Sequence, residues 1–133
     1  MKRHRKKIAL VAALVIATAV FLAPIAVRDF NERLKLTRCL HNAKSIGLAC
    51  KLYAADHNGK YPPRLEDLAP DYLPNLDVVR CPLTSGNTGI GYDYFGGTDT
   101  DPPDKVLLRS HVSAGGRRAV VYSDVSGRVV REK

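Results

Sequence analysis

An uncharged apolar run over residues 8–27 follows a basic stub, residues 1–7, and most constrains how this chain folds. A helix needs about 20 apolar residues, at roughly 1.5 Å each, to cross a hydrocarbon core of about 30 Å. The run has that length, and only Thr18 and Pro24 interrupt it. Because positive charge resists translocation, we expect the stub to stay in the cytoplasm and residues 28–133 to lie outside the membrane.

A cleaved signal peptide is the alternative interpretation of the same segment. Ala17-Thr18-Ala19 carries the small residues that a signal peptidase accepts, with cleavage after Ala19. The apolar run continues beyond that point and is longer than the hydrophobic region of a typical signal peptide. We therefore favour a membrane anchor that stays on the chain, and we keep cleavage as the alternative.

The net charge of +8 comes mostly from the stub. Without residues 1–7, the chain has 16 Lys and Arg residues against 13 Asp and Glu residues, a balance of +3. The remaining charges alternate in sign, and no basic stripe is interleaved with aromatic residues. The sequence thus predicts no nucleic-acid partner.

Apolar residues recur at helical spacing after the apolar run. Steps of three and four residues place them on one helix face, and Asn58-Gly59 supplies residue types that end a helix in a left-handed cap. We expect one helix from the membrane to about His57. The residues of this face are Leu36, Cys39, Ala43, Ile46, Cys50 and Tyr53.

A proline-rich loop and several short β-prone runs follow this helix. Residues 65–68 and 71–74 form short helical turns between prolines, with Leu65, Leu68, Tyr72 and Leu73 spaced to pack on the long helix. Gly, Pro, Asp and Ser clusters then separate runs that are rich in β-branched and aromatic residues. The predicted fold is α+β, with a long N-terminal helix packed on a small antiparallel sheet. The expected strands are residues 78–81, 90–95, 106–109, 119–123 and 128–131, and residues 124–127 form a hairpin loop with Gly127 at positive φ.

Three cysteines lie in the part of the chain expected outside the membrane, where disulfides persist. Cys39 and Cys50 share a helix face but stand about 16 Å apart along the axis, too far to bridge each other. Either could pair with Cys81, or all three could be free thiols. No Cys-X-X-Cys pair is present, which removes the strongest signal for a zinc or thioredoxin-like site.

The order of these segments, together with several short motifs, resembles type IV pilins and the major pseudopilin of type II secretion. The motifs are Cys39-Leu40-His41-Asn42, Ile46-Gly47-Leu48-Ala49, YAADHNG at 53–59, YPP at 61–63 and Cys81-Pro82, with a looser match over 111–116, 119–122 and Asp124. The resemblance implies a pilin-like domain, a Cys39–Cys81 disulfide, and a single-pass protein of the bacterial inner membrane with a periplasmic domain. It also implies assembly with other pseudopilin or secretion-system subunits, and Ala9, Ala12, Ala13, Ala17 and Ala19 would allow self-association through close helix packing.

One family feature is missing. Members usually begin the apolar helix with a prepilin peptidase site and a glutamate five residues into the mature chain, whereas residues 7–12 read KIALVA. We therefore expect no cleavage or methylation there. A membrane-anchored envelope binding module that does not polymerise is the alternative function.

An acidic loop is the one candidate metal site. Asp99, Asp101 and Asp104 cluster carboxylates of the kind that calcium prefers, and major pseudopilins bind calcium in a comparable loop. The four histidines show no metal-ligand spacing. Ser110-His111 alone is a weak hydrolase signal, and no phosphate loop or Gly-X-Ser-X-Gly motif is present, so we expect a protein that is not an enzyme.

Overall fold

The structure is a computed structural model that describes residues 2–84, 89–111, 113 and 115–132. Val112 and Ala114, two residues of the C-terminal motif, lie outside the described residues, as does Met1 of the basic stub. The chain forms two compact units, Met1–Asn31 and Glu32–Lys133. Helix α1, Lys2–Asp56, contributes residues to both units.

In the second unit, α1 buries the face that the spacing predicts. Leu36, Cys39, Ala43, Ile46 and Cys50 are all buried, and Tyr53 is half-buried. The helix ends at Asp56, one residue before the predicted end, and the Gly59 N–H donates to the Ala54 carbonyl at 2.8 Å. Asn58 and Gly59 have φ values of 54° and 78°, the left-handed cap that their residue types favour.

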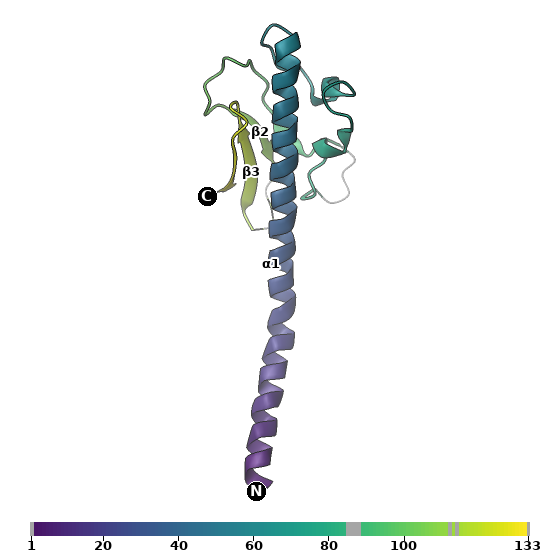
Figure 1. Cartoon of the computed structure of the whole chain (residues 1–133). Coiled ribbons are helices and arrows are strands. Elements are labelled where there is room, and N and C mark those ends of the chain that lie inside the picture. Colours follow the sequence, from purple (N-terminus) through teal and green to yellow (C-terminus); the bar gives the residue numbers. More distant parts are fainter. Residues whose placement is uncertain (1, 85–88, 112, 114, 133) are drawn as a thin grey trace. The chain divides into compact units, whose positions relative to one another are not determined.

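A four-stranded antiparallel sheet in the order β1-β2-β3-β4 makes the second unit an α+β fold, as predicted. Within this unit, the sheet lies on one side of α1 and the proline-rich loop on the other (Figure 1). The strands are β1 (Tyr92–Tyr94), β2 (Val106–Ser110), β3 (Arg117–Tyr122) and β4 (Gly127–Arg131).

One predicted strand is wrong. Val78 and Val79 lie in a 3₁₀ helix, η2 (Leu76–Val79), and not in a strand over residues 78–81. The Asn75 side chain accepts a hydrogen bond from the Asp77 N–H at 2.6 Å, which caps the turn and outweighs the β preference of two valines. The earlier turn, η1 (Leu65–Leu68), forms where predicted and buries Leu65 and Leu68.

The turn between β3 and β4 differs from its prediction at one position. Val125, with φ 64°, takes the left-handed conformation that was expected at Gly127. Gly127 lies close to α1, since a Cβ there would lie 2.9 Å from both the Leu40 and the Lys44 side chains, whose ends would have to shift. The glycine lets this hairpin approach α1 closely.

Gly47 produces a second close approach, in the middle of the core. An added Cβ would lie 3.3 Å from Val121 on β3 and 3.7 Å from Leu107 on β2. Both of these side chains are completely buried. The helix and the sheet therefore pack closely where α1 has no side chain.

Candidate functional site

The apolar segment of α1 is the largest candidate functional surface. From His4 to Asn31, every residue is exposed, including Ile8, Leu14 and Phe21 at 66%, 68% and 77%. This part of the helix is long and apolar enough to cross a membrane. A soluble protein rarely exposes a contiguous apolar surface of this kind, and such surfaces mark membrane or protein interaction sites.

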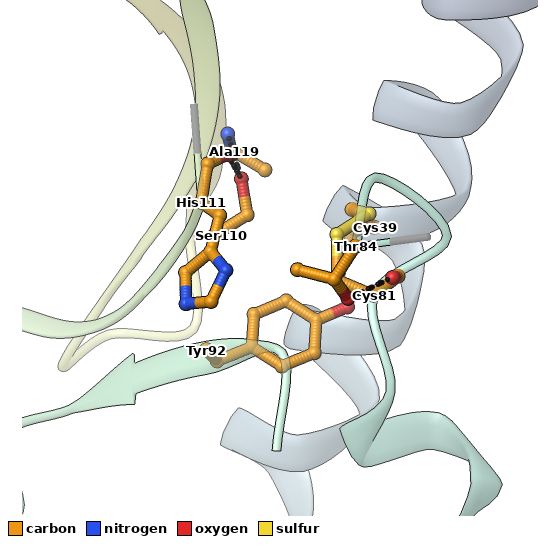
Figure 2. The surroundings of a disulfide bond; sticks show 7 residues. All are labelled: Cys39, Cys81, Thr84, Tyr92, Ser110, His111 and Ala119. Atoms are coloured by element: carbon orange, nitrogen blue, oxygen red, sulfur yellow. Dashed lines mark hydrogen bonds between the residues drawn. A yellow bond between two sulfur atoms is a disulfide. The ribbon is translucent and has the colours of Figure 1, made fainter. Parts of the chain in front are cut away.

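A disulfide between Cys39 and Cys81 ties α1 to the end of the proline-rich loop (Figure 2). The two Cα atoms are 5.1 Å apart, and both residues are buried. This is the pairing that the resemblance favoured. It closes a loop with a sequence separation of 42, which contains both 3₁₀ helices.

The sheet packs directly against this disulfide. The Tyr92 hydroxyl of β1 donates to the Cys39 carbonyl at 2.9 Å, and the Thr84 hydroxyl donates to the Cys81 carbonyl at 2.7 Å (Figure 2). A Cβ at Gly91 would lie 2.3 Å from the Cys81 nitrogen, so only glycine fits there. The bridge joins the helix to the loop, and the Tyr92 hydrogen bond attaches the first strand to the same place.

Cys50 is a free thiol inside the core and completely buried. Burial raises the pKa of this thiol to about 12. A thiol of this kind stays protonated and unreactive, so Cys50 behaves as a small apolar side chain.

The aspartates of the acidic loop do not converge. No group of three or more His, Cys, Asp or Glu side chains that could hold a metal ion occurs within the described residues. Asp101 instead accepts from the Lys105 ammonium at 2.7 Å and from the Thr98 N–H at 2.8 Å, and these contacts lower its pKa. The calcium site at Asp99, Asp101 and Asp104 stays a prediction, and the cation would compete with Lys105 for Asp101.

The Ser110-His111 pair does not form a catalytic arrangement. Ser110 is completely buried, its hydroxyl donates to the His111 carbonyl at 2.9 Å, and it accepts from the Ala119 N–H at 2.9 Å. The hydroxyl therefore connects β2 to β3 through the backbone. In Figure 2 the hydrogen bond drawn to the Ser110 hydroxyl comes from Ala119 and not from the His111 ring.

Two features of the site escaped prediction from the sequence. The ion pair between Lys105 and Asp101 has the i, i+4 spacing of a helix but lies in a turn, so helical spacing gave no reason to expect it. Arginine and aromatic side chains also gather on the face of the sheet that points away from α1. The alternation of residues along β3 was the signal for the second feature, because Arg118, Val120 and Tyr122 share one side of the strand.

Comparison with known protein families, with curated protein sequences and with solved structures finds no match to this chain.

Proposed function

We propose that this protein is a membrane-anchored, pseudopilin-like structural subunit that acts by assembling with other envelope subunits of a secretion or type IV pilus-related system. In this proposal, residues 8–27 anchor the chain in the bacterial inner membrane and residues 28–133 form its periplasmic domain. The work of the protein is mechanical, and no residue carries out a chemical step.

The observation that carries the proposal is the difference in burial between the two parts of α1. The helix is uniformly exposed and apolar over residues 8–27, whereas its later residues supply one wall of a folded core. A long N-terminal apolar helix with a small antiparallel sheet is the arrangement of a pilin. A single helix that serves both purposes can couple contacts in the membrane to the position of a domain outside it.

Small residues give the anchor a surface for close helix contacts. Ala9, Ala13 and Ala17 recur at intervals of four and therefore share one side of the helix. Such side chains let helix backbones approach closely in lipid, where van der Waals packing drives association. Partner helices are expected on this side of the anchor.

Site-specific crosslinking in native membranes tests the proposal. A photoreactive amino acid is placed at Ala13 on the small-residue side, and the adducts are identified by mass spectrometry. We expect adducts with pseudopilin-like or other secretion-system subunits. The matched control is the same amino acid at Val15, two residues away on the helix, which should give fewer such adducts.

Membrane orientation is tested in the same cells. Ser126 is exposed, so Ser126→Cys should react with a membrane-impermeant maleimide in intact spheroplasts, whereas Lys6→Cys should react only after lysis. A reversed pattern would contradict the proposed topology. Adducts with lipid alone at Ala13 would contradict assembly.

A second candidate function is a stand-alone, membrane-anchored binding module that does not polymerise. The sequence of the anchor favours it, because residues 7–12 lack a peptidase site and no acidic residue precedes Asp29. In the family that the chain resembles, a glutamate in the apolar helix compensates the charge of a neighbouring subunit's N-terminus. The crosslinks at Ala13 distinguish the two functions, since adducts with other pseudopilin-like subunits fit only an assembling subunit, whereas an uncleaved chain is expected of both.

A further inference from the structure

The two edges of the sheet differ in what lies beside them. At the first edge, β1 is only three residues long, and the proline-rich loop contacts it. The Gly91 N–H donates to the Val79 carbonyl at 2.8 Å, and the Tyr94 hydroxyl donates to the Pro62 carbonyl at 2.7 Å. At the other edge, β4 has five residues, and no segment within the described residues pairs with its outer side. β4 is therefore the open edge of this sheet.

The hydrogen bonds at the ends of the β3–β4 ladder show which residues face that edge. The Tyr122 N–H donates to the Ser126 carbonyl, and the Glu132 N–H donates to the Gly116 carbonyl, both at 2.9 Å. Hydrogen-bonded pairs alternate along an antiparallel ladder. Because both bonds continue the register of β3 with β4, the even-numbered residues of β4 bond to β3 and the odd-numbered residues face away from it.

Gly127, Val129 and Arg131 therefore present their backbone groups at the open edge. The N–H and C=O groups of these three residues have no hydrogen-bond partner in the part of the chain that the structure describes. They recur every two residues, about 7 Å, which is the interval at which an added strand forms its hydrogen bonds. An open edge of this kind is a template for an extended segment, and the main chain of that segment supplies the affinity.

The side chains at this edge determine which segment fits. Val129 and Arg131 point to the same face of the sheet as the buried Ala119, yet Val129 is still 41% exposed. Arg131 is exposed and has no carboxylate partner among the described residues. Neighbouring strands favour apolar side chains beside apolar ones and opposite charges beside each other. We therefore expect an apolar side chain beside Val129 and a carboxylate beside Arg131.

A second copy of β4 is the alternative occupant, and the direction of α1 argues against it. Two identical edges pair antiparallel about a two-fold axis perpendicular to the sheet. Such an axis reverses every direction in the sheet plane, and in the second unit α1 runs alongside β3 (Figure 1). The α1 helices of the two copies would then enter their second units from opposite ends. Chains anchored in one membrane, as we propose for this protein, cannot meet in that way.

We propose that β4 binds an extended segment of a partner protein as an additional antiparallel strand. The segment pairs through its main chain with Gly127, Val129 and Arg131, and it carries a carboxylate followed two residues later by an apolar side chain. This inference goes beyond the proposed function. Only the exclusion of a second copy rests on the membrane anchor, and the binding of a free peptide to β4 needs no assembly in the membrane.

Amide hydrogen exchange of the full chain in non-ionic detergent micelles, measured by NMR, tests the proposal. The probe is the peptide Thr-Glu-Thr-Val-Thr with blocked ends. In the free chain, the Val129 and Arg131 amides should exchange faster than those of Arg128 and Val130, which bond to β3. Saturating peptide should slow exchange at Val129 and Arg131 roughly tenfold, because both amides become hydrogen-bonded.

Two N-methylated peptides are the matched controls. N-methylation of the peptide's valine removes an N–H that faces β4, whereas N-methylation of the threonine before it removes an N–H that faces solvent. Both modifications restrict the peptide backbone, so the difference between them reports the hydrogen bond at the edge. Only the peptide with N-methylated valine should fail to slow exchange at Val129.

Two variants of the chain test the choice of side chains. Arg131→Gln should weaken binding of the peptide by up to about fivefold, the largest effect expected of one cross-strand ion pair. Arg128→Gln is the matched control, because it removes the same charge from the opposite face of the same strand, where Arg128 lines a hollow with Asp104 and Asp124. That variant should bind the peptide as the wild-type chain does.

Three results would overturn the proposal. The first is unchanged exchange at Val129 and Arg131 in millimolar peptide. The second is equal protection by the two N-methylated peptides, which would show that the peptide binds through side chains alone. The third is protection that rises with the concentration of the chain itself, without peptide, together with a dimer in analytical ultracentrifugation. That result would make a second copy the occupant.

Discussion

Two stretches of one helix meet opposite environments in this protein. Residues 8–27 of α1 are exposed on every side, whereas residues 36–54 bury one face against the sheet and the loop. Ile16 is 63% exposed and Ile46 is completely buried, although both are isoleucines in the same helix. The comparison shows that helix formation does not depend on core formation here. The local sequence makes the whole helix, and packing partners bury only its second part.

The largest expected effect comes from opening the bridge that holds the second part. Replacing Cys39 and Cys81 with alanine frees a loop with a sequence separation of 42, and chain entropy predicts a loss of about 4 kcal/mol in the free energy of unfolding. Chemical denaturation of the full chain in detergent measures it. Cys50→Ala is the control, because it removes a buried thiol without opening a loop. An equal loss in that control would show that buried volume matters more than the bridge.

A matched pair of isoleucine substitutions tests the comparison itself. Ile46→Ala should lower the free energy of unfolding by roughly 2–5 kcal/mol, because it leaves a cavity between helix and sheet. Ile16→Ala should leave the same quantity unchanged, since Ile16 is 63% exposed and belongs to the other compact unit. Denaturation curves of the two variants measure these free energies of unfolding. Similar decreases in both variants would contradict the distinction between the two stretches.

A charge in the apolar stretch should act on the membrane and not on the fold. Val15→Arg places a cation near the centre of the segment, at a cost of about 2.5–3.5 kcal/mol for membrane insertion. The fraction recovered with membranes should fall. Leu52→Arg is the matched control, since Leu52 is also exposed on α1 but belongs to the folded unit. Unchanged recovery of Val15→Arg would argue that residues 8–27 do not span the bilayer.

A smaller effect is expected when acid protonates Asp101. Lys105 and the Thr98 N–H lower the pKa of this carboxyl in the folded state, so its contribution to stability is present above the unfolded pKa of about 3.9 and is lost as the pH falls through the folded value. Melting temperatures measured below about pH 4 should therefore fall less steeply in Asp101→Asn than in the wild-type chain. Identical slopes would show that the ion pair with Lys105 contributes nothing.

The last expected effect is that of calcium. If the cation binds Asp99, Asp101 and Asp104 it competes with Lys105 for Asp101, so Lys105→Ala should increase any calcium-dependent rise in melting temperature. One site at a hundredfold excess over Kd adds about 2.7 kcal/mol, less the lost ion pair. Magnesium is the control cation. If millimolar calcium leaves the melting temperature unchanged in both the wild-type chain and Lys105→Ala, the loop is a solvated turn and not a calcium site.

Much of the fold follows from local patterns, and the failures have identifiable causes. The steps of three and four from Leu36 to Cys50 predict the buried face of α1, because helical periodicity depends only on neighbouring residues. The same kind of reasoning fails at Val78 and Val79, where a capping side chain outweighs β preference. It also predicts positive φ at Gly127, whereas this glycine instead lies close to the Leu40 and Lys44 side chains.

The sequence by itself determined the apolar helix of residues 8–27, the amphipathic face that follows it and the α+β class, since all three depend on composition and period. Tertiary structure alone decided which residues from distant segments meet. Cys39 rather than Cys50 reaches Cys81, Lys105 neutralises Asp101, and Arg118 forms an ion pair with Glu132. The physical reason is that periodicity specifies which face of an element is apolar, whereas register and packing across the core specify what that face contacts.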